Sequence, residues 1–182
     1  MKKIYGLIGY PLGHSFSKGY FNTKFTEENI SAEYLNFELE KIDDFKNHIE
    51  IDKIYGLNVT IPHKSSIIKQ LDEIDDEAKE VGAVNVIKFI RNGSQIILKG
   101  YNSDVIGFTD SIKPLLENYN KKALILGTGG VSKAIKFSLD KLGIESIFLS
   151  RNNKPGCIPY EMLIKYIMDD YNIIVNASPV VM

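Results

Sequence analysis

The sequence has a single cysteine, Cys157, among 182 residues. A disulfide within the chain is therefore excluded, and a reducing cytoplasm is the simpler expectation for its location. The preceding Lys154-Pro155-Gly156 segment is typical of a loop. We therefore interpret Cys157 as an incidental loop thiol rather than a catalytic one.

A basic excess and long apolar runs are also missing. The chain has 22 Lys and Arg residues against 23 Asp and Glu residues, a formal net charge of −1. Proteins that bind nucleic acids or membrane surfaces usually carry excess positive charge, so we expect neither partner. The N-terminal apolar run, Ile4–Ile8, is too short for a secretion signal or a membrane span. The hydrophobic fraction of 44% is that of a globular protein with a buried core.

Short apolar runs alternate with helical patterns along the chain. This alternation indicates an α/β fold with a mostly parallel sheet. The Asn92-Gly93 pair predicts a hairpin turn, and Gly143 marks the end of a helix. The predicted strands are Ile4–Ile8, Glu33–Phe37, Ile54–Val59, Ala83–Ile90, Gln95–Lys99, Lys122–Leu126, Glu145–Leu149 and Ile173–Asn176. The predicted helices are Ser17–Glu28, Ile42–Ile49, Asp72–Glu80, Ser103–Leu116, Val131–Leu142 and Tyr160–Met168.

The best domain boundary lies near Tyr101, where the predicted hairpin ends and a long helix begins. We therefore expect one domain over residues 1–101 and a second over residues 102–182. In the first, Tyr20 and Lys24 match the Tyr-x-x-x-Lys pair of short-chain dehydrogenases, but in those enzymes the glycine-rich turn comes first in the chain. We interpret Tyr20 instead as a core-facing residue of an amphipathic helix.

A glycine-rich turn, Gly127–Ser132, connects a predicted strand to a predicted helix with the sequence Gly-Thr-Gly-Gly-Val-Ser. Backbone N–H groups in such a turn can approach a pyrophosphate, and the N-terminus of the helix adds partial positive charge. The match to G-x-G-x-x-G is imperfect because Ser132 replaces the third glycine, although serine is small enough for close packing. An ordinary tight turn between strand and helix is the alternative.

The strand after this turn ends near Leu149, where dinucleotide-binding domains contact the ribose of the cofactor. A carboxylate here would bind the 2′-hydroxyl of NAD, and Ser150–Lys154 contains none. Arg151 can instead pair with a phosphate, with Lys154 as a nearby positive charge. This segment therefore favours NADP, and a solvated loop arginine is the alternative.

Polar residues gather where the predicted strands of the first domain end. Ser15 and Ser17 follow the first strand and suit a turn that binds a hydroxyl or a carboxylate; a helix N-cap is the alternative. Asn58 and Thr60 share one face of a later strand because side chains alternate along it. Lys64 follows in the first turn of the next helix, an electrostatically unfavourable place that hints at function, although an exposed lysine there costs little.

Two further residues complete this polar group. Asn85 adds an amide at the start of a strand, and Asp104 adds a carboxylate at the start of a helix. Asp104 could equally be a favourable first-turn charge. Together the group supplies hydroxyls, amides, one lysine and one carboxylate, which is what a small polyhydroxylated acid needs from its binding site.

Six segments of the chain occur in the order seen in shikimate dehydrogenases: Gly9–Ser17, Asn58–Lys64, Gly82–Asn85, Asn102–Gly107, Gly127–Gly130 and Asn176–Pro179. The whole chain resembles this family of enzymes, which reduce 3-dehydroshikimate to shikimate with NADPH in chorismate and aromatic amino acid biosynthesis. The resemblance implies an N-terminal shikimate-binding substrate domain followed by an incomplete Rossmann-like NADP-binding domain, in a monomer or homodimer.

The resemblance also implies roles for particular residues. Lys64 would be the catalytic proton-transfer group, partnered by Asp104. Ser15 and Ser17 would hold the substrate carboxylate. The ring hydroxyls would contact Thr60, Asn85 and Asp104, with Asn58 lining the site. The implied cofactor residues are Gly127, Thr128, Gly129, Gly130, Val131, Ser150, Arg151, Asn152 and Ser178, and no metal site is implied.

Two departures from the family pattern bear on activity. Val181 stands where the family usually has a glycine, and the chain ends at Met182, whereas family members continue through further strands and a helix that brings a glutamine to the substrate. We therefore expect this chain to be nearly inactive and marginally stable in its second half, with an unpaired edge at Ile173–Asn176. Three hypotheses stay open: an NADP-dependent shikimate dehydrogenase, a quinate/shikimate dehydrogenase, and a non-catalytic remnant that binds shikimate-like acids.

Overall fold

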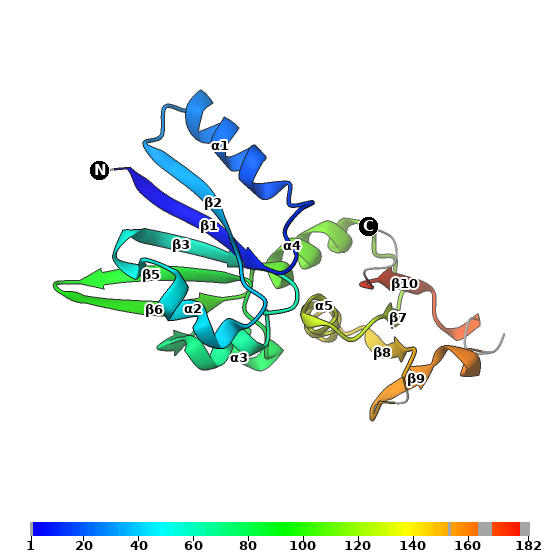
Figure 1. Ribbon diagram of the computed structural model, residues 1–182. Helices are drawn as coiled ribbons and strands as arrows, with labels where there is room; N and C mark the ends of the chain where they lie inside the picture. Colours follow the sequence, from blue (N-terminus) through cyan, green and yellow to red (C-terminus); the bar gives the residue numbers. More distant parts are fainter. Residues whose placement is uncertain (1, 153, 164–168, 179–182) are drawn as a thin grey trace. The chain divides into compact units, whose positions relative to one another are not determined.

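The computed structural model describes residues 2–152, 154–163 and 169–178 (Figure 1). The chain divides into two compact units, Met1–Asn102 and Ser103–Met182, which are described separately below. Within the described ranges, no helix is both long and apolar enough to cross a membrane.

The first unit is built on one mixed sheet (Figure 1). Its described strands are β1 (Lys3–Gly9), β2 (Ala32–Glu38), β3 (Ile54–Val59), β4 (Glu73–Ile74), β5 (Val86–Asn92) and β6 (Gln95–Tyr101). They lie in the order β2-β1-β3-β5-β6-β4, and β5 runs antiparallel to both of its neighbours. The edge at which β1 and β3 end is therefore also the edge at which β5 begins.

Helices and short helical turns cover this sheet. They are α1 (Ser17–Glu27), α2 (Phe45–His48) and α3 (Asp76–Val81), with 3-10 helices at Ile42–Asp44, Ile51–Lys53 and Ser66–Gln70. The main core contains buried side chains such as Ile8, Phe45 and Ile67, all fully shielded from solvent. Phe21 and Phe25 of α1 belong to a smaller cluster, in which they pack against the buried residues Leu7, Leu12 and Tyr34. This cluster attaches α1 to the sheet.

Two details of the first unit differ from the sequence predictions. Asp72–Glu80 does not form a single exposed helix, because Glu73–Ile74 pairs with β6 as the short strand β4. The helix begins later, after Asp75, whose side chain caps it. The predicted hairpin is present, but its first strand continues past Ile90 to Asn92, which pairs with Gln95, so the loop is Gly93-Ser94 with a φ of +61° at Gly93.

The second unit contains a parallel sheet whose described strands lie in the order β10-β7-β8-β9 (Figure 1). The core of this unit lies between α5 and the sheet and contains the fully buried residues Ile125 and Leu139. Within the described residues β10 lies at the end of the sheet, as the sequence predicted for Ile173–Asn176. The elements are α4 (Ser103–Ile112), β7 (Lys122–Leu126), α5 (Gly130–Lys141), β8 (Glu145–Ser150), β9 (Cys157–Pro159) and β10 (Ile173–Asn176), with 3-10 helices at Lys113–Leu115 and Tyr160–Met162.

Two predictions for the second unit need correction, and a third falls partly outside the described residues. Cys157 begins the strand β9 rather than lying in a loop, so the described part of this unit has one strand more than expected. The helix predicted for Ser103–Leu116 ends at Ile112 and tightens into a 3-10 turn that contains Pro114. Of the helix predicted for Tyr160–Met168, the described residues Tyr160–Met162 form a 3-10 turn. Residues 164–168 lie outside the described residues, as do Pro179, Val181 and Met182.

Candidate active site

Backbone hydrogen bonds join the ends of β1, β3 and β6 to the start of β5. The N–H of Thr60 donates to the carbonyl of Ile8 at 2.8 Å, and the N–H of Val59 donates to the carbonyl of Asn85 at 2.8 Å. Asn85 in turn donates its own N–H to the carbonyl of Tyr101 at 3.0 Å. Thr60 and Asn85, which were singled out separately in the sequence, therefore lie at the same edge of the sheet.

Lys64 lies in the turn that follows β3, and its side chain is half-buried. The N–H of Val84 donates to the carbonyl of Lys64 at 2.7 Å, which ties this turn to the start of the hairpin. The buried ring of His63 anchors the turn from the other side, with Nε2 at 2.5 Å from the carbonyl oxygen of Leu39. Lys64 precedes the 3-10 helix Ser66–Gln70, so the prediction that it occupies the first helical turn was wrong.

Tyr34 links two of the predicted site residues, Ser17 and Asn58. Its buried phenol donates to Oδ1 of Asn58 at 2.8 Å. Burial raises the pKa of Tyr34 to about 12, and a hydrogen bond from the Ser17 hydroxyl opposes part of this rise. At neutral pH the phenol is therefore protonated and acts as a donor. The sequence analysis missed Tyr34, because one aromatic residue in a strand indicates only a core position.

The backbone of Tyr34 also fixes α1 to the sheet. Oδ1 of Asn22 accepts the N–H of Tyr34, and Nδ2 of Asn22 donates to the carbonyl of Tyr34, both at 2.9 Å. The ring of Phe21 stacks on the ring of Tyr34, with centroids 4.7 Å apart and planes 17° from parallel. These contacts hold the start of α1, and with it Ser17, beside the phenol.

The serine pair does not cap α1. The N-cap residue of this helix is Phe16, and it makes no side-chain capping bond, so the alternative reading of Ser15 or Ser17 as an N-cap was wrong. The hydroxyl oxygen of Ser15 is buried and has no hydrogen-bond partner among the described residues. Because buried polar atoms are nearly always paired, an unpaired hydroxyl beside Ser17 fits a place where a ligand atom binds.

The glycine-rich turn of the second unit combines one crowded position with one open position. Gly127 has a φ of +112°, and a Cβ at this residue would lie 3.0 Å from the carbonyl oxygen of Ala177. Its N–H donates to the carbonyl of Leu149 at 3.0 Å, so the turn is held close to the neighbouring strands. Gly129, the N-cap of α5, has open space where its Cβ would be. The turn thus leaves a cradle at the N-terminus of α5, as pyrophosphate binding requires.

Basic and polar residues after β8 lie close to this turn. Nζ of Lys154 donates to Oγ1 of Thr128 at 3.0 Å, which places a positive charge on the glycine-rich turn. Arg151 and Asn152 are exposed. Ser150 is buried, and its Oγ accepts the N–H of Asn152 at 3.2 Å, so it shapes the loop.

The remaining predicted residues of the second unit lie at element ends. Ser178 follows β10, where its N–H and Oγ lie 3.0 and 2.7 Å from Oδ1 of Asn176. Gly130 and Val131 begin α5, and Ser132 is fully buried in its first turn, as close packing at the third glycine position requires. Asp104 is half-buried in the first turn of α4.

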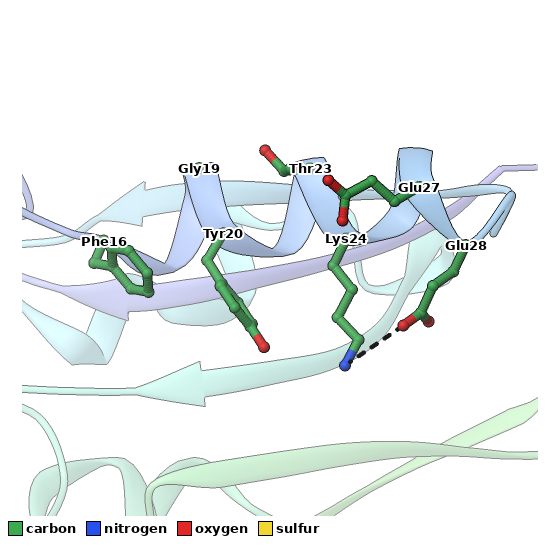
Figure 2. Close-up of a pocket in the computed structure, with 7 residues that line it drawn as sticks. All are labelled: Phe16, Gly19, Tyr20, Thr23, Lys24, Glu27 and Glu28. Carbon is green, nitrogen blue, oxygen red and sulfur yellow. Dashed lines mark ion pairs between the residues drawn. The ribbon is translucent and has the colours of Figure 1, made fainter.

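An open hollow of about 520 Å³ runs along the outer face of α1 and is lined by Phe16, Gly19, Tyr20, Thr23, Lys24, Glu27 and Glu28 (Figure 2). Its lining includes the Lys24–Glu28 ion pair at 3.7 Å. Tyr20 is 47% exposed here, so the prediction that it faces the core was wrong. Phe21 and Phe25 take the buried side of the helix instead. None of the predicted site residues lines this hollow.

The two units together define a class of protein. The first unit has a group of polar residues at one edge of its sheet. The second unit has a parallel sheet with a glycine-rich turn at a helix N-terminus. This is the architecture of a two-domain α/β protein with a Rossmann-like second domain. Residues 7–87 match the family model described as the shikimate dehydrogenase substrate binding domain.

Individual relatives give the same assignment. The chain is 39% identical to a shikimate dehydrogenase (NADP(+)) from Methanococcus maripaludis, over 98% of this chain and 68% of the relative. A crystal structure of shikimate dehydrogenase 1 from Peptoclostridium difficile is 38% identical, with a TM-score of 0.83 over 99% of this chain and 68% of that one. The chain belongs to the shikimate dehydrogenase family.

The predicted resemblance and α/β fold class are thereby confirmed. The share of each relative that the chain spans is also informative. A shikimate dehydrogenase (NADP(+)) from Caldanaerobacter subterraneus subsp. tengcongensis is 43% identical over 81% of this chain but only 52% of its own length. The chain therefore spans between about half and two thirds of the length of these relatives.

Proposed function

We propose that this chain is an NADP-dependent shikimate dehydrogenase that interconverts 3-dehydroshikimate and shikimate. In this proposal residues 1–101 form the substrate domain and residues 102–182 form the NADP-binding domain. The observation that carries the proposal is the sheet edge of the first unit, where the buried hydroxyl of Ser15, unpaired among the described residues, is next but one in the chain to Ser17, and where the phenol of Tyr34 donates to Asn58. This edge lies within the part of the chain that matches the family's substrate-binding domain.

The proposed substrate contacts follow from the chemistry of a hydroxylated ring acid. Ser15 and Ser17 supply hydroxyl donors for the carboxylate, because charge-assisted hydrogen bonds are the strongest that a neutral side chain can make. Thr60, Asn85 and Asp104 supply partners for the ring hydroxyls. Asn58 lines the same edge.

Reducing a ketone requires a hydride on carbon and a proton on oxygen. NADPH, when bound, supplies the hydride. We assign the proton to the Lys64 ammonium, which can donate to the carbonyl oxygen and stabilise the negative charge that develops there. In the oxidative direction the neutral amine accepts the hydroxyl proton, so oxidation is expected to be faster at alkaline pH. Asp104 is the second residue proposed for catalysis.

The residues of the second unit fit an NADP molecule. The cradle at Gly129 and the N–H groups at the N-terminus of α5 would hold the pyrophosphate. Arg151 would hold the 2′-phosphate in fork geometry, with Lys154 adding positive charge beside Thr128. Ser150 and Asn152 would shape this loop, and Ser178, which lies beside Gly127, would lie near the cofactor.

The test is the conversion of shikimate with NADP⁺, followed as NADPH absorbance under single-turnover conditions with protein in excess. Removing a proton-transfer group typically slows a reaction by about 10²–10⁴-fold, so Lys64→Ala should lose turnover to that extent while binding shikimate normally. Lys69→Ala, an exposed lysine in the next 3-10 helix, is the matched control and should turn over like the native chain.

Three results would contradict parts of the proposal. Unchanged turnover in Lys64→Ala would remove this lysine from the mechanism. Shikimate binding with no conversion in the native chain would favour a non-catalytic remnant. Faster conversion of quinate than of shikimate would favour a quinate/shikimate dehydrogenase.

A further inference from the structure

The side-chain amide of Asn58 is bonded within the protein through its carbonyl oxygen. Its Oδ1 accepts the phenol hydrogen of Tyr34 at 2.8 Å. An asparagine side chain has one carbonyl acceptor and one NH₂ donor group. Because the Tyr34 phenol donates to Oδ1, the amide is oriented with its oxygen toward Tyr34 and its NH₂ group turned away from Tyr34, where it can meet a ligand.

The partner that sets this orientation is itself held on several sides. Tyr34 is 2% exposed, its ring is stacked on Phe21, and both polar groups of its backbone are bonded to the side chain of Asn22. With a pKa of about 12, its phenol keeps its proton throughout the neutral range. Tyr34 is therefore a fixed hydrogen donor, and a flipped Asn58 amide would set its own N–H donors against the phenol hydrogen.

The Ser17 hydroxyl acts on the same phenol, because it lowers the pKa of Tyr34 against the effect of burial. A carboxylate is a stronger acceptor than a neutral phenol, so the Ser17 hydroxyl can turn to an acidic ligand when one is bound. The Asn58 amide has no such choice, because its carbonyl oxygen stays bonded to Tyr34. The Ser17 hydroxyl can thus change its hydrogen-bond partner, whereas the Asn58 amide keeps one orientation.

We propose that Tyr34 is a positioning residue that commits Asn58 to donate hydrogen bonds toward the substrate. The proposal rests on the proposed function for the identity of the ligand. Its consequence is that the NH₂ group of Asn58 is presented beside the hydroxyls of Ser15 and Ser17, an arrangement that favours a ligand with carboxylate or other acceptor oxygens there.

The first experiment is a double-mutant cycle on shikimate affinity, measured by calorimetric titration of the native chain, Tyr34→Phe, Asn58→Ala and the double variant. Tyr34→Phe keeps the stacked ring and removes the hydroxyl. We expect its Kd for shikimate to rise about tenfold, the effect of misplacing one hydrogen bond. In the Asn58→Ala background the same change should cause no further rise, because Tyr34 acts through Asn58. Tyr5→Phe, which removes a hydroxyl beside the same small cluster, is the control and should leave Kd unchanged.

A rise of similar size in both backgrounds, or no rise in either, would overturn the proposal. A second measurement does not depend on shikimate. In ¹H–¹⁵N NMR spectra of the ligand-free chain, the two side-chain amide protons of Asn58 should show one set of contacts in the native protein and average in Tyr34→Phe. If the native chain binds no shikimate, the proposed function fails, and this spectrum alone decides the role of Tyr34. Asn58 signals that are unchanged by Tyr34→Phe would rule it out.

Discussion

The positions of single residues in the candidate site were predictable where a residue lies at the end of a predicted strand. Asn58 and Thr60 could be placed together because side chains alternate along one strand. Asn85 joins them only in the structure, because β5 runs antiparallel to β3 and so begins at the edge where β3 ends. Tyr34 could not be placed with them, because nothing in its local pattern shows that its hydroxyl meets Asn58, which lies 24 residues further along the chain. Contacts between side chains of different elements depend on packing, which periodicity does not record.

Two glycines of the same turn should respond in opposite ways to one methyl group. In Gly127→Ala the new Cβ meets the Ala177 carbonyl and the φ of +112° becomes strained, so we expect a loss of about 1–3 kcal/mol of stability. In Gly129→Ala the added methyl enters open space, so stability should change little while NADP⁺ affinity falls. Thermal denaturation and NADP⁺ titration of both variants check this pair. Equal loss of stability in both would show that the space at Gly129 is not a cradle.

Arg151 should determine the preference for NADP over NAD. A hydrogen bond to a charged group contributes about 1.5–3 kcal/mol, which is roughly ten- to a hundredfold in affinity. Arg151→Ala should therefore weaken NADP⁺ binding by this factor and leave NAD⁺ binding nearly unchanged, as fluorescence titrations with each cofactor can measure. Lys113→Ala, an exposed lysine of the same unit, is the control for general charge effects. Equal weakening with both cofactors would mean that Arg151 supports the loop instead.

At the scale of elements, the strands that begin and end as predicted are short apolar runs with clear breakers on either side. Ile54–Val59, Lys122–Leu126 and Ile173–Asn176 have the predicted bounds. The short strands β4 and β9 were missed because the acidic sequence around Glu73 is typical of a helix and the Pro155-Gly156 pair is typical of a loop. Both are paired to a neighbouring strand, so tertiary contacts override local preference there.

The attachment of α1 should depend on Asn22 more than on its exposed neighbours. Asn22→Ala leaves the N–H and carbonyl of Tyr34 without their side-chain partners, and an unpaired buried group costs about 1–3 kcal/mol. Thr23→Ala, on the exposed face of the same helix (Figure 2), should change stability by less than about 0.5 kcal/mol. Urea denaturation followed by circular dichroism measures both. A midpoint for Asn22→Ala equal to that of Thr23→Ala would contradict the anchoring role.

At the scale of the whole molecule, each unit has its own sheet and its own buried core. The family and fold class followed from the six ordered motifs, because each motif lies at a strand end or a helix start where backbone geometry restricts the residue type. The roles of the individual site residues remain predictions. They depend on whether the first unit recognises shikimate at the edge that contains Ser17, Asn58 and Asn85.

The most direct measurement is therefore a calorimetric titration of the 182-residue chain with shikimate. The account predicts saturable binding of one shikimate per chain, with an affinity in the range of about 1 μM–1 mM that is usual for enzyme substrates. The variants Ser17→Ala and Asn85→Ala should each weaken this binding, whereas Thr23→Ala, on the outer face of α1, should not. Heats no larger than those of dilution at millimolar shikimate, or binding that both site variants leave unchanged, would contradict the account.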